Sequence, residues 1–181
     1  MKIIGVVGQP SGGKDTVAEY IGSKGFVHIS SGDYIREDMK ALGLPLDRTS
    51  MSTFVAQKRK EEGNEYPVRK IADSLTTNTV IAGMRNTAEI NLFKEKFGED
   101  FIIVAVEAPI ESRYEWAKLR GRASDHISFE RFKEEEEKER ANNSGAHEVD
   151  SVIKMADHTI INDSTKEALF QKVESLLKSI G

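Results

Sequence analysis

A short apolar segment leads directly into a glycine-rich loop, and this junction constrains the chain more than any other feature. Residues 2–7 read KIIGVV and residues 8–16 read GQPSGGKDT. The glycines permit a tight turn in which successive backbone N–H groups face one anion, and Lys14 adds a positive charge beside it. The next residues have helical apolar spacing, so the loop also lies at the positive end of a helix dipole. Together these features predict a site for a nucleoside triphosphate. The alternative, a glycine-rich hairpin between core elements, gives no role to a lysine before a helix.

Apolar runs rich in Val and Ile alternate with helix patterns along the chain. One helix pattern covers residues 86–98, where Asn86 and Glu89 have capping-box spacing and Gly98 ends the run. The last helix pattern begins at Ser164. The alternation predicts a three-layer α/β fold with a five-stranded parallel sheet, whose ligands bind at the carboxyl ends of the strands. The predicted strands cover residues 3–7, 26–30, 79–83, 101–106 and 158–162.

We expect a single domain over residues 1–181, because the chain contains no linker-like tract and no internal repeat. Residues 31–75 have helical periodicity without a strand pattern, which predicts a helical insert beside the glycine-rich loop. Residues 120–128 are short and polar, and we expect them to form a lid. The remaining core is predicted to comprise residues 1–30, 76–119 and 129–181.

The composition argues against several classes of function. The formal net charge is −4, whereas a broad nucleic-acid surface usually makes a domain strongly basic. The chain has no cysteine, which excludes disulfides and thiolate metal sites, and no apolar run long enough to cross a membrane. The sequence does not begin with a signal-peptide pattern, so we expect a cytoplasmic protein. Its expected partners are small nucleotide substrates rather than nucleic acid or membranes, and its expected state is a monomer or a small homo-oligomer.

Four segments resemble the adenylate-kinase-like nucleoside monophosphate kinases, and the likeness extends over essentially the whole chain. GQPSGGKDT is similar to the phosphate loop of that family, and HISSGDYIRE (residues 28–37) is similar to its monophosphate-binding segment. VIAGMR (residues 80–85) resembles the segment that supplies a second acceptor arginine. RYEWAKLRGR (residues 113–122) resembles the helix that leads into the lid. With ADHTIINDS (residues 156–164), the likeness is closest to archaeal-type relatives of adenylate kinase and to dephospho-CoA kinases.

The resemblance implies ATP with Mg²⁺ as the phosphate donor and a nucleoside monophosphate as the acceptor. Phosphoryl transfer needs cationic groups that converge from several loops, and arginine suits this task because it holds a phosphate by two parallel bonds. The donor nucleotide is expected to contact Gly8, Pro10, Ser11, Gly12, Gly13, Lys14, Asp15, Thr16, Arg120 and Asn162. The acceptor is expected to contact Ser31, Asp33, Arg36 and Arg85. Catalysis is expected to depend on Lys14, Arg85, Arg120 and Arg122.

Two positions depart from the usual kinase pattern, and both concern the metal. Asp15 stands where a Ser or Thr usually contacts magnesium. Ala82 stands where relatives usually have an acidic residue at the end of the third strand. We expect Asp15 to serve as the magnesium ligand in place of the missing carboxylate. The alternative is that Asp15 is only a first-turn residue that the helix dipole favours.

Two other functions stay open at this stage. Transfer to a hydroxyl, as in dephospho-CoA kinase, needs a carboxylate base, and Asp33 would take that role. Otherwise we expect Asp33 to cap a helix that starts near Tyr34. A nucleotide-binding regulatory module with little catalysis is the second possibility, which Ala82 favours and the acceptor arginines oppose. Asn162 is placed near an adenine by analogy only, with a simple turn as the alternative, and residues 133–140 (KEEEEKER) predict a solvated helix face.

Overall fold

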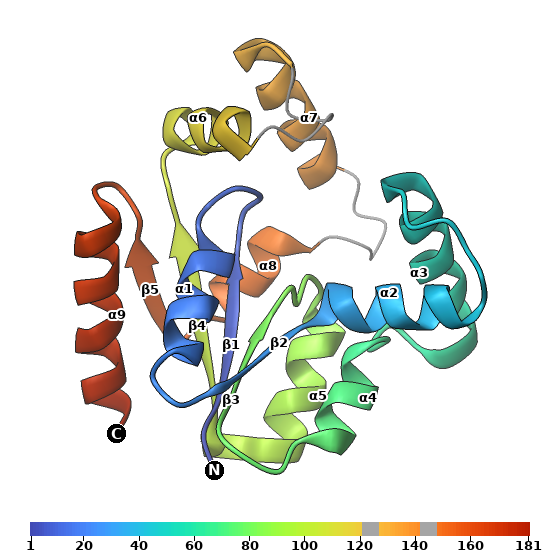
Figure 1. Cartoon of the computed structure of the whole chain (residues 1–181), viewed down its shortest axis with the longest axis horizontal. Helices are drawn as coiled ribbons and strands as arrows, with labels where there is room; N and C mark the ends of the chain where they lie inside the picture. The colour runs from blue at the N-terminus through green and yellow to red at the C-terminus, as the bar shows by residue number, and fades with distance from the viewer. Residues whose placement is uncertain (121–126, 142–147) are drawn as a thin grey trace.

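The computed structural model describes residues 1–120, 127–141 and 148–181. These residues form a five-stranded parallel sheet in the order β2-β3-β1-β4-β5 (Figure 1). The predicted α/β fold with a five-stranded parallel sheet is therefore confirmed, and each predicted strand begins and ends within one residue of the observed one. The strands are β1 (Ile3–Gly8), β2 (Val27–Ser30), β3 (Thr79–Ala82), β4 (Phe101–Glu107) and β5 (His158–Ile161).

The helices lie between these strands in the chain. At the start of α5, Asn86 and Glu89 form the predicted capping box, and Gly98 ends the helix at a φ of 53°. Among the helices that the structure describes, none combines the length and the apolar character needed to span a bilayer. The helices are α1 (Lys14–Gly22), α2 (Ser31–Ala41), α3 (Arg48–Glu62), α4 (Val68–Ser74), α5 (Thr87–Phe97), η1 (Gly98–Asp100), α6 (Ile110–Arg120), α7 (Phe129–Ala141), α8 (Val149–Lys154) and α9 (Lys166–Ile180).

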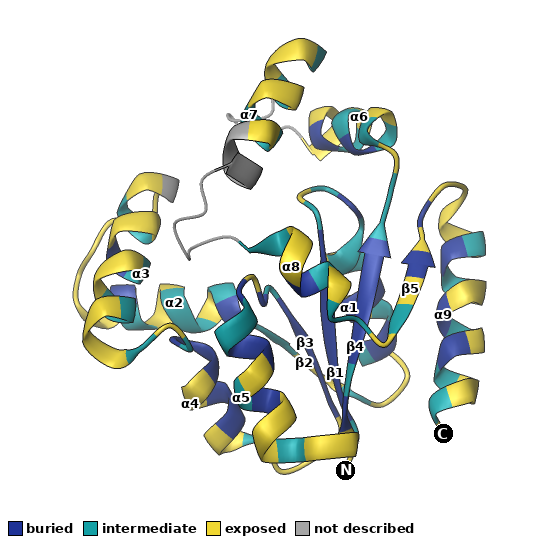
Figure 2. Ribbon diagram, turned by 180° about the vertical axis from the view of Figure 1, so that it is seen from behind, coloured by how far each residue is buried: buried dark blue, intermediate teal, exposed yellow. Residues whose placement is uncertain are grey.

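Helices cover both faces of the sheet, which gives three layers (Figure 1). Helices α4, α5 and α8 pack on one face, and α1 and α9 pack on the other. Successive side chains of a strand point to opposite faces, so Ile3 and Val7 of β1 join the first core while Ile4 and Val6 join the second. Buried residues accordingly concentrate on the strands and on the inner sides of these helices (Figure 2).

The carboxyl ends of the strands meet at one edge of the sheet. The central strand β1 pairs with β3 up to Val6 and Ala82, and with β4 up to Gly8 and Val106. The loop that follows β1 extends beyond this edge, and α6 and α7 lie above it (Figure 1). Several loops that are distant in sequence thus surround the residues after β1.

Residues 31–75 form α2, α3 and α4 without a strand, as predicted. Helices α2 and α3 lie beside the sheet (Figure 1), whereas α4 packs on its face. This segment has a small core of its own, made of Met39, Phe54 and Tyr66. The Tyr66 hydroxyl donates a 2.8 Å hydrogen bond to Asp38. Lys70 of α4 pairs with the same carboxylate at 2.7 Å, which ties α4 to α2.

Two predicted helix starts are wrong. Helix α2 begins at Ser31 with Ser30 as its N-cap, so Asp33 lies in the first turn and does not cap a helix near Tyr34. The reason is that β2 continues into α2 without a connecting loop. In α9 the N-cap is Thr165 rather than Ser164, because the Thr165 side chain accepts the hydrogen bond from the Ala168 amide.

Candidate functional site

The loop between β1 and α1 has the backbone of an anion-binding turn. Ser11 and Gly13 adopt the left-handed region, with φ of 59° and 94°. The Gly12 amide donates to the Gln9 carbonyl at 3.1 Å, which closes the turn. Alternation of left-handed and right-handed residues directs successive N–H groups to one concave side. The loop therefore fits an anion of the size of a phosphate.

Gly13 and Asn162 lie against each other at the base of this loop. A Cβ atom at position 13 would overlap the side-chain amide of Asn162 and would also need the left-handed φ. The Asn162 amide is buried and donates a 3.1 Å hydrogen bond to the Gly12 carbonyl. Asn162 therefore supports the loop from the end of β5, and its predicted contact with an adenine stays a prediction.

The predicted residues after the loop occupy the first turn of α1. Lys14 and Thr16 are half-buried and Asp15 is exposed. The N-cap is Gly13, which has no side chain to satisfy the first N–H groups of the helix. These N–H groups and the helix dipole favour a negative charge at this end, close to the concave loop.

A hydrogen bond joins the ends of β2 and β3. The buried Ser31 hydroxyl donates to the Gly83 carbonyl at 2.9 Å. Gly83 has a φ of 95°, and a Cβ there would lie 2.5 Å from the Ser31 oxygen. This contact brings the start of α2, which carries Asp33 and Arg36, next to the segment that carries Arg85.

The two predicted acceptor-binding arginines differ in their surroundings. Arg36 pairs with Asp33 one turn earlier in α2 at 2.6 Å, and both side chains are largely exposed. Arg85 follows β3, and its exposed guanidinium makes no hydrogen bond or ion pair with the residues that the structure describes. The backbone of Arg85, in contrast, is held tightly, since its N–H donates to Glu89 at 2.6 Å and its carbonyl accepts from the Glu148 amide at 2.9 Å.

A buried arginine that sequence reasoning missed as a site component lies against the loop. Arg113 of α6 is 3% exposed, and its Cδ would lie 3.8 Å from a Cβ at Gly12. Its guanidinium pairs with Glu136 of α7 and also donates to the Ala108 carbonyl at 3.0 Å. Glu136 belongs to the acidic run that predicted a solvated face, so at this position the prediction is wrong. The residues around Glu136 are all charged, so the sequence does not indicate which member of the run is buried.

The predicted lid arginines are only partly described. Arg120 is the last residue of α6 and is exposed. Arg122 lies outside the described residues. Helix α6 contacts α7 through Tyr114, whose ring lies 5.2 Å and 5.6 Å from the rings of Phe129 and Phe132.

The metal ligands expected at this edge are few. Ala82 is buried at the end of β3, and Asp15 is exposed at the start of α1. Within the described part of the chain, no three or more His, Asp or Glu side chains gather as a metal cluster would require. This donor set fits a magnesium ion held mainly by phosphate oxygens and water, with Asp15 as a single protein ligand.

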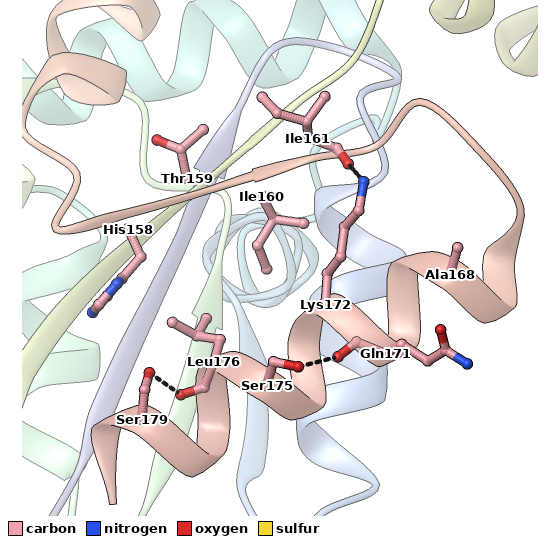
Figure 3. Close-up of a pocket in the computed structure, with 10 residues that line it drawn as sticks. All are labelled: His158, Thr159, Ile160, Ile161, Ala168, Gln171, Lys172, Ser175, Leu176 and Ser179. Carbon is pink, nitrogen blue, oxygen red and sulfur yellow. Dashed lines mark hydrogen bonds between the residues drawn. The ribbon is translucent and has the colours of Figure 1, made fainter.

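A surface pocket between β5 and α9 is not part of this site (Figure 3). Its lining residues include none of the predicted site residues. Lys172, its most prominent cation, donates to the Ile161 carbonyl at 2.6 Å and pairs with Asp163 at 2.9 Å. The charge of that lysine is therefore already compensated within the protein.

Comparison with known sequences agrees with this geometry. The model of the AAA domain family matches residues 7–133. The UPF0200 protein of Thermococcus onnurineus is 35% identical over 98% of this chain and 97% of its own length. The UPF0200/UPF0201 protein of Archaeoglobus fulgidus is 33% identical over 100% of this chain, which spans 56% of that relative's length.

Solved structures with a similar fold include small-molecule kinases. Shikimate kinase from Acinetobacter baumannii, in complex with shikimate, superposes with a TM-score of 0.61 at 16% identity, over 99% of this chain and 94% of that one. A gluconokinase from Sinorhizobium meliloti gives a TM-score of 0.56 at 14% identity, over 99% and 93%. At these identities the likeness shows the fold alone, a kinase-like domain with a phosphate loop. From the sequence matches, the chain belongs to the UPF0200 family and carries an AAA domain with a nucleotide-binding loop.

Proposed function

We propose that the protein transfers the γ-phosphate of ATP to the phosphate of a nucleoside monophosphate. The observation that carries this proposal is the Ser31–Gly83 hydrogen bond between the ends of β2 and β3. It supports a joint role for Arg36, which follows in α2, and Arg85, which follows β3. Both arginines are exposed, and the strands that precede them, β2 and β3, lie on one side of β1, the strand that leads into the loop that fits a phosphate. A site with cationic groups on the acceptor side as well as on the donor side suits an acceptor that carries its own phosphate.

In the proposed reaction, an oxygen of the acceptor phosphate attacks the γ-phosphorus, and the bond from that phosphorus to the bridging oxygen breaks. The products are ADP and a nucleoside diphosphate. The loop N–H groups and Lys14 hold the β- and γ-phosphates, and Thr16 holds the α-phosphate. Arg36 and Arg85 hold the acceptor phosphate, while Arg120 and Arg122 neutralise charge on the transferred group. When bound, Mg²⁺ screens the charge of the phosphate oxygens, with Asp15 as its protein ligand.

The proposal is tested by the response of Lys14 to substitution. Lys14→Ala should abolish turnover of ATP with each of AMP, CMP, GMP and UMP, since this lysine brings a full charge to the outer phosphates. Thermal shift without nucleotide should change little, whereas the stabilisation by ATP should disappear. Lys94→Ala is the matched control, because Lys94 is exposed in α5, away from the loop. Unchanged turnover in Lys14→Ala would refute the kinase proposal.

Transfer to a hydroxyl is the second candidate, and the fold likeness to shikimate kinase favours it. Shikimate offers hydroxyl groups and no phosphate, and a hydroxyl acceptor needs a base to take its proton. Asp33 is exposed at the start of α2 and would be that base, with Arg36 paired to it. In this case Asp33→Asn should remove most activity while Arg36→Ala keeps it. If the acceptor is a monophosphate, Arg36→Ala should instead remove most activity while Asp33→Asn keeps it. Binding of ATP without turnover of any acceptor would instead favour a regulatory module.

A further inference from the structure

The carboxylate of Glu89 is buried beneath the proposed acceptor site. The residue is 1% exposed and lies in the first turn of α5. It accepts hydrogen bonds from the backbone N–H of Arg85 at 2.6 Å and from that of Asn86 at 3.3 Å. It also pairs with the guanidinium of Arg59 at 2.9 Å. Burial raises the pKa of Glu89, while Arg59 and the two amides oppose that change.

A capping box alone does not explain this arrangement. A capping glutamate needs only the N-cap amide and can stay in solvent. Here the carboxylate of Glu89 also accepts a hydrogen bond from the Arg85 amide, and it pairs with the positive charge of Arg59, which lies outside its own helix. Separating the members of a buried ion pair leaves an uncompensated charge in the interior, which is strongly destabilising. The pair therefore holds together the two elements that supply it.

The partner arginine comes from the insert. Arg59 belongs to α3, and its side chain is 11% exposed in the pair with Glu89. A second contact joins the same two regions, since the Asn86 side-chain amide donates to the Asn64 carbonyl at 3.0 Å. The position of α3 is therefore linked to the start of α5 by a charge pair and a hydrogen bond.

The opposite side of Arg85 is held from α8. The Glu148 amide donates to the Arg85 carbonyl at 2.9 Å. The Glu148 carboxylate accepts from both the amide and the hydroxyl of Thr87, at 3.1 Å and 2.6 Å. Both peptide groups of Arg85 are thus fixed, while its guanidinium points to solvent without a partner among the described residues.

From these contacts we propose that Glu89 is a positioning residue, which holds Arg85 ready for the acceptor phosphate and, through Arg59, makes that placement depend on α3. The proposal rests on the proposed function, in which Arg85 binds the acceptor. Preorganised groups bind more tightly than groups that must be ordered on binding. Loss of the Arg59–Glu89 pair should therefore weaken acceptor binding and leave donor binding unchanged.

The test uses Glu89→Gln, and also the double variant Glu89→Gln/Arg59→Met, which removes both charges and so avoids an unpaired buried ion. Binding of AMP, CMP, GMP and UMP is measured by calorimetry in each variant, with ATP as the donor ligand. We expect at least fivefold weaker binding of the monophosphate that the wild type prefers, and less than a twofold change for ATP. In an Arg85→Ala background, adding the same substitutions should change monophosphate binding less than twofold.

Asp38→Asn is the matched control, because it breaks an ion pair within the insert that does not touch Arg85. It should leave monophosphate binding within twofold of the wild type. A loss from Glu89→Gln of equal size with and without Arg85 would overturn the proposal, since Glu89 would then act independently. Unchanged monophosphate binding in both Glu89 variants would overturn it as well.

An NMR measurement separates failure of this proposal from failure of the proposed function. The Arg85 amide proton, which lies in a short hydrogen bond to a carboxylate, should shift upfield in both Glu89 variants and stay in place in Asp38→Asn. If it does not shift, the positioning role is wrong whatever the protein binds. If it shifts but no monophosphate binds the wild type, the proposed function has failed and Glu89 positions Arg85 for another ligand.

Discussion

The side-chain amide of Asn162 donates a hydrogen bond to the carbonyl oxygen of Gly12 across 150 residues of sequence. Asn162 follows β5, an edge strand of the sheet, whereas Gly12 belongs to the loop after the central strand β1. The backbone N–H of Asn162 also donates to the Glu107 carbonyl at 2.7 Å. The outer strand β5 thus supports, through Asn162, the loop that is predicted to bind nucleotide.

This support makes Gly13 sensitive to substitution. Gly13→Ala should destabilise the protein by about 2 kcal/mol or more, from the left-handed backbone and from overlap with the Asn162 amide. Gly25→Ala is the control, because Gly25 has a φ of 100° and no neighbouring atom within 4 Å of a Cβ. It should show only the backbone part, about 1–2 kcal/mol. Urea unfolding measures both. Equal losses at the two positions would mean that the overlap with Asn162 relaxes freely.

Asp15 should affect the magnesium dependence of turnover. If it is a metal ligand, Asp15→Asn should raise the Mg²⁺ concentration for half-maximal rate about tenfold, and Asp15→Ser should restore much of the loss. Glu19→Gln removes an exposed carboxylate one turn later in the same helix and should leave the magnesium curve unchanged. If Asp15→Asn keeps the wild-type curve, Asp15 only favours the helix start, by about 0.3–1 kcal/mol.

The buried ion pair between Arg113 of α6 and Glu136 of α7 should contribute more to stability than the exposed ion pair between Arg131 and Glu135. Glu136→Gln leaves Arg113 buried without its counter-charge, and we expect a loss of about 3 kcal/mol. Glu135→Gln breaks an exposed pair with Arg131 and should lower stability by less than about 1 kcal/mol. Chemical denaturation of both variants gives the comparison. Arg113→Met/Glu136→Leu should recover most of the loss, and failure to do so would point to a different source of the stability.

The difference in stability between wild type and Glu148→Gln should depend on pH. Hydrogen bonds from the Thr87 hydroxyl and amide lower the pKa of Glu148 from its ordinary value of 4.5. A carboxyl with a lowered pKa in the folded state stabilises that state fully above its unfolded pKa. The contribution disappears as the pH falls through the lower, folded value. Wild type should therefore melt above Glu148→Gln at pH 7, with the gap narrowing as the pH falls below the ordinary value of 4.5. A gap of constant size from pH 7 down through the acid range would show that charge is not its cause.

Local patterns predicted the fold and much of the local capping. The central strands β1, β3 and β4 could be found because both of their faces are covered, so each of them is a nearly continuous apolar run. The capping box of Asn86 and Glu89 could be found because its spacing is fixed within one helical turn. Asp33 was misassigned because strand β2 continues into α2 without the connection that normally separates them.

Contacts between distant segments could not be predicted in the same way. Glu89 has the sequence signature of a capping residue, and nothing near it indicates that Arg59 will reach it from α3. Arg113 and Glu136 each stand in charged helix patterns that are typical of exposed faces. Asn162 could be assigned to the loop after a strand, but its hydrogen bond to Gly12 depends on the strand order, which the sequence pattern leaves open. The roles of the remaining site residues stay predictions.

The central position of β1 has a consequence for how the chain reaches its fold. Strand β1 leaves the ribosome before β3 and β4, yet it pairs with both of them, at residues 79–82 and 101–106. The strand that carries the nucleotide-binding loop therefore has no neighbour in the sheet until residues 79–82 have been made, and it lacks its second neighbour until residues 101–106 follow. Helix α9, which stacks Phe170 on Tyr20 of α1, arrives later still. Pairings this distant in sequence are slow to form, so the newly made chain passes through a stage in which β1, whose residues are all buried in the folded protein, is uncovered. That interval, more than the finished structure, is where we expect the protein to depend on chaperones.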